Sequence, residues 1–186
     1  SEPERAETMD KEQWQPFFAS FRREDVDTFE GYFFPFGLIQ NPQFKKSEVY
    51  PELRKMWASL DPQDVMNDLR SYSLEYQDLV FGENKSNFGK DVAAAVLRLN
   101  RMDFARAALP FLMEVLHQRR INNIQQDAVV LELLDGVESF LIRRALCSIE
   151  PTGLHAVFKG LWKKLDGDLT KAAMVEAIKT AKTVAV

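Results

Sequence analysis

The sequence predicts an all-α protein, a bundle-like array of about eight or nine helices with no significant sheet. Three observations predict this class. Apolar residues recur at helical spacing along most of the 186 residues, helix-start and helix-stop residues separate these stretches, and no segment alternates long enough to be a strand. Hydrophobic residues make up 46% of the chain, which is enough to bury a core and excludes wholesale disorder.

The domain organisation follows from composition. Residues 1–9 are mostly polar and are expected to be a disordered or frayed end, with a single helical domain over residues 10–186. Residues 1–88 carry ten Lys and Arg against seventeen Asp and Glu, whereas residues 89–186 carry fourteen against eleven. The polar loop 83–88 lies at this shift in charge and is expected to divide two sub-bundles.

Helices of the first half are expected to begin near Asp10, Val26 and Ser47. Asp10 has the spacing of a capping box and precedes a helical stripe of aromatic residues. The second helix is expected to end at Pro35 and Gly37, because proline cannot continue a helix without losing a hydrogen bond. The third helix is expected to run to about Leu60, with Ser47 as its cap.

The strongest start signal is Asp61-Pro62-Gln63-Asp64, which combines a capping acceptor, a proline at the first helical position and an early carboxylate. We expect one helix from there to Gly82. In the second half, helices are expected at 93–101, 110–118, 126–149, 154–165 and 171–182. Pro110 begins the second of these, and Thr152 is expected to cap the fourth.

The absence of several catalytic and ligand-binding motifs from the sequence narrows the classes of function that we expect. No glycine-rich phosphate loop or nucleophile elbow occurs, and His117 and His155 lie on different expected helices without metal-ligand spacing. We therefore expect no catalytic residue, metal or cofactor in this chain. Cys147 is the only cysteine, which fits a reducing cytoplasm, and its place in an apolar helix predicts inert packing. No apolar run approaches the length of a membrane helix.

Arg144 is the most unusual residue of the long helix 126–149. It falls on the same face as Val137, and Arg143 lies on the flank beside Phe140. A guanidinium on a core face needs a partner. Three interpretations remain open: a buried pair with an acid on another helix, a contact with an anion or nucleotide phosphate at a groove, and extension of the side chain past the helix end.

A second basic feature surrounds Trp162. Lys159 and Lys163 have i, i+4 spacing, and Lys164 is adjacent to them. Lysines of this kind contact the DNA backbone in some proteins, but a solvated helix face is the commoner explanation. Arg119 and Arg120 are further candidates for a backbone contact. The polar run 122–126 has the composition of a turn as well as of a base-contacting segment.

Residues 137–147, VESFLIRRALC, followed by Pro151-Thr152-Gly153-Leu154 and Phe158, resemble the middle helical region of GmrSD-type proteins. These are modification-dependent restriction and phage-defence enzymes. The resemblance covers residues 25–185, and its motif carries over Arg143 and Arg144 in an undefined structural or anion-contacting role. Complete members join a ParB-like domain with an Asp-Gly-Gln-Gln-Arg motif to an HNH nuclease domain, and neither motif occurs here.

The resemblance therefore implies a non-catalytic helical connector that supports or couples domains absent from this chain, with those flanking domains and DNA backbone as its partners. A free-standing helical protein-interaction module is the alternative. Its binding surface would be an exposed apolar patch in the aromatic-rich first half, around Trp14, Phe17, Phe33, Phe34 and Phe36. A small nucleic-acid binder that uses the candidate basic residues is a third hypothesis.

Overall fold

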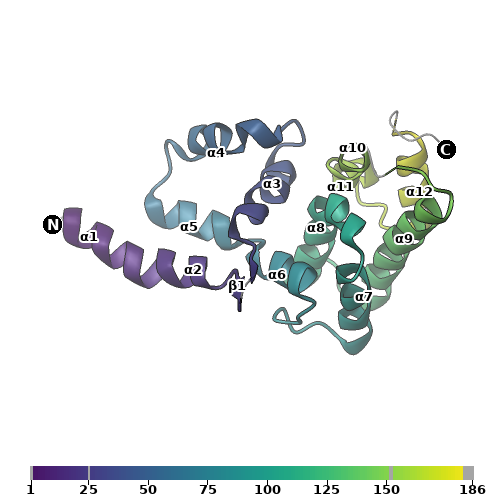
Figure 1. Cartoon of the computed structure of the whole chain (residues 1–186), viewed down its shortest axis with the longest axis horizontal. Helices are drawn as coiled ribbons and strands as arrows, with labels where there is room; N and C mark the ends of the chain where they lie inside the picture. The colour runs from purple at the N-terminus through teal and green to yellow at the C-terminus, as the bar shows by residue number, and fades with distance from the viewer. Residues whose placement is uncertain (1, 25, 151–152, 182–186) are drawn as a thin grey trace.

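The computed structural model describes residues 2–24, 26–150 and 153–181, and it confirms the all-α class. Within these residues the chain forms twelve α-helical segments (Figure 1). The sole extended pairing there is a two-residue antiparallel ladder between β1 (Arg22–Arg23) and β2 (Val26–Asp27). Such a short ladder forms a tight reversal of the chain rather than a sheet.

The first half begins with a helix that projects from the body of the molecule (Figure 1). It has three parts: α1 (Glu2–Met9), a π-helical turn (Asp10–Trp14) and α2 (Gln15–Ala19). The backbone keeps helical angles where one part meets the next. Residues 2–9 are thus helical rather than frayed, and Asp10 does not begin a helix. Four helices follow: α3 (Phe29–Gln40), α4 (Val49–Trp57), α5 (Pro62–Arg70) and α6 (Ser73–Phe81).

The second half contains two long helices and several short ones. Its α-helices are α7 (Lys90–Asn100), α8 (Leu109–Arg120), α9 (Asp127–Leu146), α10 (Leu154–Phe158), α11 (Leu161–Leu165) and α12 (Lys171–Lys179). A 3₁₀ segment, Asp103–Ala108, leads into α8.

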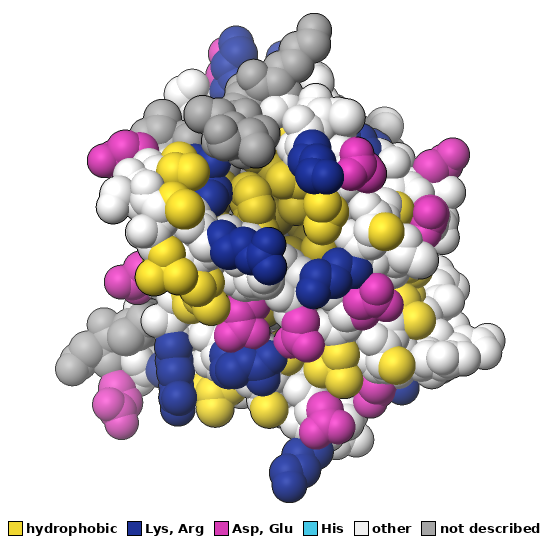
Figure 2. Space-filling view, turned by 90° about the vertical axis from the view of Figure 1, so that its right-hand side faces the viewer, with side chains coloured by type: hydrophobic (Ala, Val, Ile, Leu, Met, Phe, Trp, Pro, Cys, Tyr) yellow, Lys and Arg dark blue, Asp and Glu magenta, His cyan; other side chains and the backbone are white. Residues whose placement is uncertain are grey.

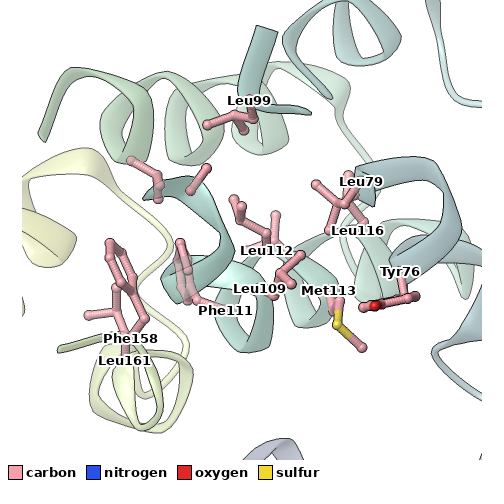
Figure 3. Packing of buried hydrophobic residues seen from close by; sticks show 14 of the residues in the cluster. Tyr76, Leu79, Leu99, Leu109, Phe111, Leu112, Met113, Leu116, Phe158 and Leu161 are labelled. Carbon is pink, nitrogen blue, oxygen red and sulfur yellow. The ribbon is translucent and has the colours of Figure 1, made fainter. Parts of the chain in front are cut away.

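Helix α8 is the centre of the hydrophobic core. All eight residues from Leu109 to Leu116 are buried, and α8 packs against α3, α6, α9, α10 and α11. Figure 3 shows Phe111 near Phe158 on one side of this helix and Leu116 near Leu79 on another. The first two turns of α8 are almost entirely apolar and require neighbours on every side, which explains the position of α8 between the other helices (Figure 1).

The aromatic residues of the first half pack against one another instead of forming an exposed patch. Phe17, Phe21 and Tyr32 are buried, and their rings meet at centroid distances of 5.0 to 6.3 Å. Phe36 is buried too, while Trp14, Phe33 and Phe34 are partly buried against the core. These residues therefore do not form the expected exposed patch, because the aromatic rings of α2 and α3 pack on one another and Tyr32 of α3 meets Tyr76 of α6.

Local signals were accurate at two helix ends and wrong at a third. The carboxylate of Asp61 accepts the backbone N–H of Gln63, and Gly82 ends α6 in the left-handed conformation, both as predicted. Pro35, however, lies inside α3. Its missing N–H removes one helical hydrogen bond, but continuing the helix buries Tyr32, Phe36 and Leu38, and this burial outweighs the loss.

Two expected helices are each divided in two. The helix expected from Asp61 to Gly82 breaks at Ser71–Tyr72, where the hydroxyls of Ser71 and Ser73 bond to the carbonyls of Asp68 and Arg70 and compete with helical bonding. The helix expected over 154–165 breaks at Gly160, whose φ of −127° is not helical. Thr152, its expected cap, lies outside the described residues.

The loop 83–88 is fixed to the body by a buried acid. Asp78 is fully buried in α6, and its carboxylate accepts the backbone N–H groups of Lys85 and Ser86 at 2.6 and 3.0 Å. Helix α6 also packs against both α7 and α8. The buried apolar residues on either side of the loop belong to one cluster, from Phe17 to Ala181.

Candidate functional site

Arg144 is buried, with 8% of its surface exposed, but no acidic side chain among the described residues bonds it. Its Nη2 donates to the backbone carbonyl of Glu150 at 2.7 Å, and its Nε has no hydrogen-bond partner among the residues that the structure describes. The guanidinium carbon lies 5.9 Å from the centre of the Phe140 ring. Burial of Arg144 is as expected, but the described residues do not provide the acidic partner suggested for it. The guanidinium instead reaches the chain just beyond the end of α9.

Arg144 lies in the wall of a groove between α9 and α12. The groove has a volume of about 300 Å³, and its lining is mostly apolar. At one end the two helices pack so closely that a Cβ on Gly136 would lie 2.1 Å from Met174 Cε. The lining residues are Gly136, Ser139, Phe140, Arg143, Arg144, Cys147 and Ile149 from α9 and the turn after it, with Lys171, Val175, Ile178 and Lys179 from α12.

The charges that line the groove are all positive. Arg143 and Arg144 belong to α9, Lys171 and Lys179 belong to α12, and no carboxylate is among the described residues that line the groove. Lys179 forms an exposed ion pair with Glu176, one turn earlier on α12. Figure 2 shows this end of the molecule, where hydrophobic side chains gather in a hollow bordered by Lys and Arg.

Three large apolar side chains of α9 and α12 are exposed. Leu146 is 80% exposed and Ile142 is 40% exposed, and Val175 on α12 is also exposed. Single exposed apolar residues are ordinary, and of these three Val175 is the one that lines the groove. The expectation of inert packing for Cys147 was wrong, because its thiol is free and exposed at the groove wall.

Arg119 and Arg120 are held within the protein. Arg119 Nε donates to Asp127 Oδ1 at 2.6 Å, so it ties the end of α8 to the start of α9. Arg120 forms an ion pair with Glu75, which is fully buried in α6, and its Nη2 donates to the carbonyl of Ser71 at 2.7 Å. Both guanidinium groups are occupied by these contacts, which argues against the expected role in DNA binding.

Lys159 and Lys163 line a second cavity, of about 430 Å³, between the two halves of the chain. They do share a surface, although Gly160 places them on different helices. The same cavity contains Glu114, whose carboxylate accepts the hydroxyl of Tyr72 at 2.9 Å. Because a carboxylate repels phosphate, this cavity is a poor site for a DNA backbone. Lys164 is exposed and lies outside it.

Sequence reasoning identified one wall of the groove and missed the other. Arg143 and Arg144 stood out because charge interrupts the apolar face of α9. Lys171, Val175 and Lys179 repeat every four residues along α12, a helical stripe of mixed character that is typical of a solvated face. What makes this stripe part of a groove is the packing of α12 on α9, which no local pattern reveals.

The residues that the structure describes contain no group of three or more His, Cys, Asp or Glu placed to hold a metal ion. Among the same residues, no helix has the length and apolar character needed to cross a bilayer. Comparisons of the chain with protein-family models, with curated proteins and with solved structures found no match.

Proposed function

We propose that this chain is a non-catalytic helical scaffold that docks another part of a protein assembly through the groove between α9 and α12. The observation that carries the proposal is the groove itself, an apolar hollow whose charged lining residues are Arg143, Arg144, Lys171 and Lys179. Contiguous apolar surface with a charged rim is characteristic of protein-binding sites on soluble proteins. The single free thiol of Cys147 favours a cytoplasmic location.

Two forms of this proposal differ in what is docked. The residues that resemble GmrSD-type proteins, 137–147, include five residues of the groove wall. If that relationship holds, the chain is a connector, and the groove receives a flanking ParB-like or HNH domain of the same polypeptide. In the alternative form the chain is a free-standing interaction module, and the groove receives a separate protein.

Site-specific photo-crosslinking in the native host tests the docking proposal. A photoreactive amino acid replaces Leu146, beside the groove, or Tyr50, which is equally exposed on α4 in the other half of the molecule. We expect Leu146 to crosslink one discrete polypeptide segment and Tyr50 not to crosslink it. A crosslink within one longer polypeptide supports the connector, and a crosslink to a separate protein supports the free-standing module.

Equal products from both positions, or none from Leu146, would contradict the docking function. Arg143→Glu in the groove and Lys164→Glu outside it then serve as a matched pair. Both residues are exposed and both changes reverse one charge. The Leu146 crosslink should weaken only with Arg143→Glu.

A further inference from the structure

We propose that the cavity between the two halves of the chain binds a small zwitterion, with its ammonium group at Glu114 and its anionic group at Lys159 and Lys163. This inference goes beyond the docking function and does not depend on it. The cavity has a volume of about 430 Å³, which is typical of sites for small molecules. Residues of α3, α8, α10 and α11 form most of its walls, so the folded chain assembles the site from segments far apart in sequence.

Glu114 places a negative charge in the buried wall of the cavity. Its side chain is 7% exposed, and its carboxylate accepts the hydroxyl of Tyr72 at 2.9 Å and the side-chain amide of Gln118 at 2.7 Å. Both donors are neutral, and no cation of the described residues forms an ion pair with this carboxylate. A carboxylate accepts about four hydrogen bonds, so Glu114 retains capacity for an ammonium group that enters the cavity and compensates its charge.

Lys159 and Lys163 place positive charge in the walls of the same cavity. Lys159 is partly exposed and Lys163 is exposed, whereas Glu114 is buried, so the cations lie on the solvent side of the carboxylate. Within the described part of the chain, neither lysine forms an ion pair. The cavity thus holds opposite charges that do not satisfy one another directly. A zwitterion satisfies both, whereas a ligand of one sign is repelled by one of them.

The walls between these charges are rich in aromatic rings. Phe111 and Phe158 line the cavity with ring centroids 6.5 Å apart (Figure 3), and Trp162 lines it beside Lys163 in the sequence. Aromatic surfaces of this kind favour an apolar or planar ligand body and stack on cations as well. The ligand class is therefore a small molecule with an apolar body that separates an ammonium from an anionic group.

Binding of three matched compounds to the full chain tests the inference. The zwitterion para-(aminomethyl)phenylacetate carries both charges across a phenyl ring, para-methylbenzylamine keeps only the ammonium, and para-methylphenylacetate keeps only the carboxylate. We expect the zwitterion to bind at least about fivefold more tightly than either of the others. In heteronuclear NMR titrations it should shift the indole N–H of Trp162 and not that of Trp14. No binding of the zwitterion at about 10 mM, or an equal affinity for one of the singly charged compounds, would overturn the inference.

Variants at both ends of the cavity make the test specific. Glu114→Gln keeps the size of the side chain and removes its charge, so we expect it to weaken binding of the zwitterion and the amine at least about fivefold, and not that of the acid. Lys159→Gln combined with Lys163→Gln should weaken binding of the zwitterion and the acid only. Lys164→Gln, at an exposed position of α11 outside the cavity, is the matched control and should change neither affinity.

Folding of the variants is checked by circular dichroism. Lys159 and Lys163 are at least partly exposed, so their double variant should fold even where Glu114→Gln does not. An unchanged affinity of this double variant for the zwitterion would overturn the inference.

A lysine of a partner protein carries the same ammonium group as a small molecule. The peptide Ala-Lys-Ala, acetylated and amidated at its ends, represents this source and should bind more weakly than the zwitterion, because it lacks the anionic group. Tighter binding of the peptide at Trp162 would assign the cavity to a partner protein and overturn the inference.

Discussion

At the scale of single residues, the chain buries charge in two different ways. Glu75 is fully buried, and Arg120 bonds it from α8, so both charges are compensated inside the protein. Arg144 is also buried, but among the described residues its hydrogen-bond partner is the carbonyl of Glu150 and no carboxylate. Sequence periodicity predicted that Arg144 lies on the buried face, yet it could not show whether an acid faces it, because that depends on helices distant in sequence.

Two replacements of Arg144 distinguish the contribution of its packing to stability from the contribution of its charge. Arg144→Ala removes both the side-chain packing and the bond to Glu150, and we expect it to lower the free energy of unfolding by about 1–2 kcal/mol. Arg144→Met keeps much of the packing and removes an uncompensated charge, so its effect should be within about 1 kcal/mol of zero. Urea denaturation measures both changes. An equal loss in the two variants would show that the charge itself is stabilising.

Removal of the Glu75 charge, unlike removal of the Arg144 charge, should clearly destabilise the protein. Glu75→Ala leaves Arg120 without its carboxylate, and since Arg120 remains partly exposed we expect a loss of roughly 2–3 kcal/mol. The double change Glu75→Ala/Arg120→Met removes both charges and should restore part of this stability. A double variant no more stable than Glu75→Ala would argue against the ion pair as the cause.

Three of the four tyrosines give the stability of the fold a dependence on alkaline pH. Burial raises the pKa of Tyr76 to about 12 and the pKa values of Tyr32 and Tyr72 further above their usual range. In the unfolded chain the tyrosine hydroxyls lose their protons at about pH 10. Stability is therefore complete below that pH and falls as pH rises toward the folded pKa values. In Tyr50→Phe, tyrosinate absorbance should appear together with unfolding, and its appearance in the folded protein would contradict the burial.

At the scale of helices, the sequence predicted starts and stops where a local interaction decides them. The carboxylate of Asp61 and the left-handed Gly82 act within one turn, and both predictions are confirmed. Pro35 was misjudged because the burial of its neighbours comes from α6 and α8, which are far away in sequence. The break at Ser71–Tyr72 depends on hydroxyl groups whose alternative hydrogen bonds could have been suspected but not ranked.

Two glycines test how closely other side chains approach the backbone. A Cβ on Gly37, inside α3, would lie 2.6 Å from the ring of Phe44, whereas a Cβ on Gly160 would meet nothing within 4 Å. We expect Gly37→Ala to destabilise the protein by about 1–3 kcal/mol despite the better helix propensity of alanine. Gly160→Ala, at a negative φ, should be neutral or stabilising by up to about 1 kcal/mol. Thermal unfolding compares them, and the reverse order would contradict the packing.

At the scale of the whole molecule, the uneven charge of the sequence has a structural counterpart. The groove, with its four cations, lies in the positively charged second half, while α1 and the acidic first half lie at the other end of the molecule (Figure 1). The sequence predicted the charge division and the class of fold. It did not predict the groove, because the groove exists only where α12 packs on α9, and α12 begins 25 positions after α9 ends.

The contacts that the candidate basic residues make within the protein argue against DNA as a ligand. Arg119 and Arg120 are bonded within the protein, and Lys159 and Lys163 share a cavity with Glu114. We therefore expect fluorescence anisotropy to detect no salt-sensitive binding of a DNA duplex at physiological ionic strength. Binding that weakens with salt and disappears in Lys159→Glu/Lys163→Glu would contradict this and restore the nucleic-acid hypothesis.

The exposed thiol of Cys147 makes the groove directly observable. Since it is the only cysteine of the chain, a maleimide fluorophore labels a single position without any engineered change. A dye there senses the polarity of the groove, so its emission reports occupancy in real time. The same thiol also carries a hazard during purification: without a reducing agent, two copies can join through Cys147, and each would then obstruct the other's groove.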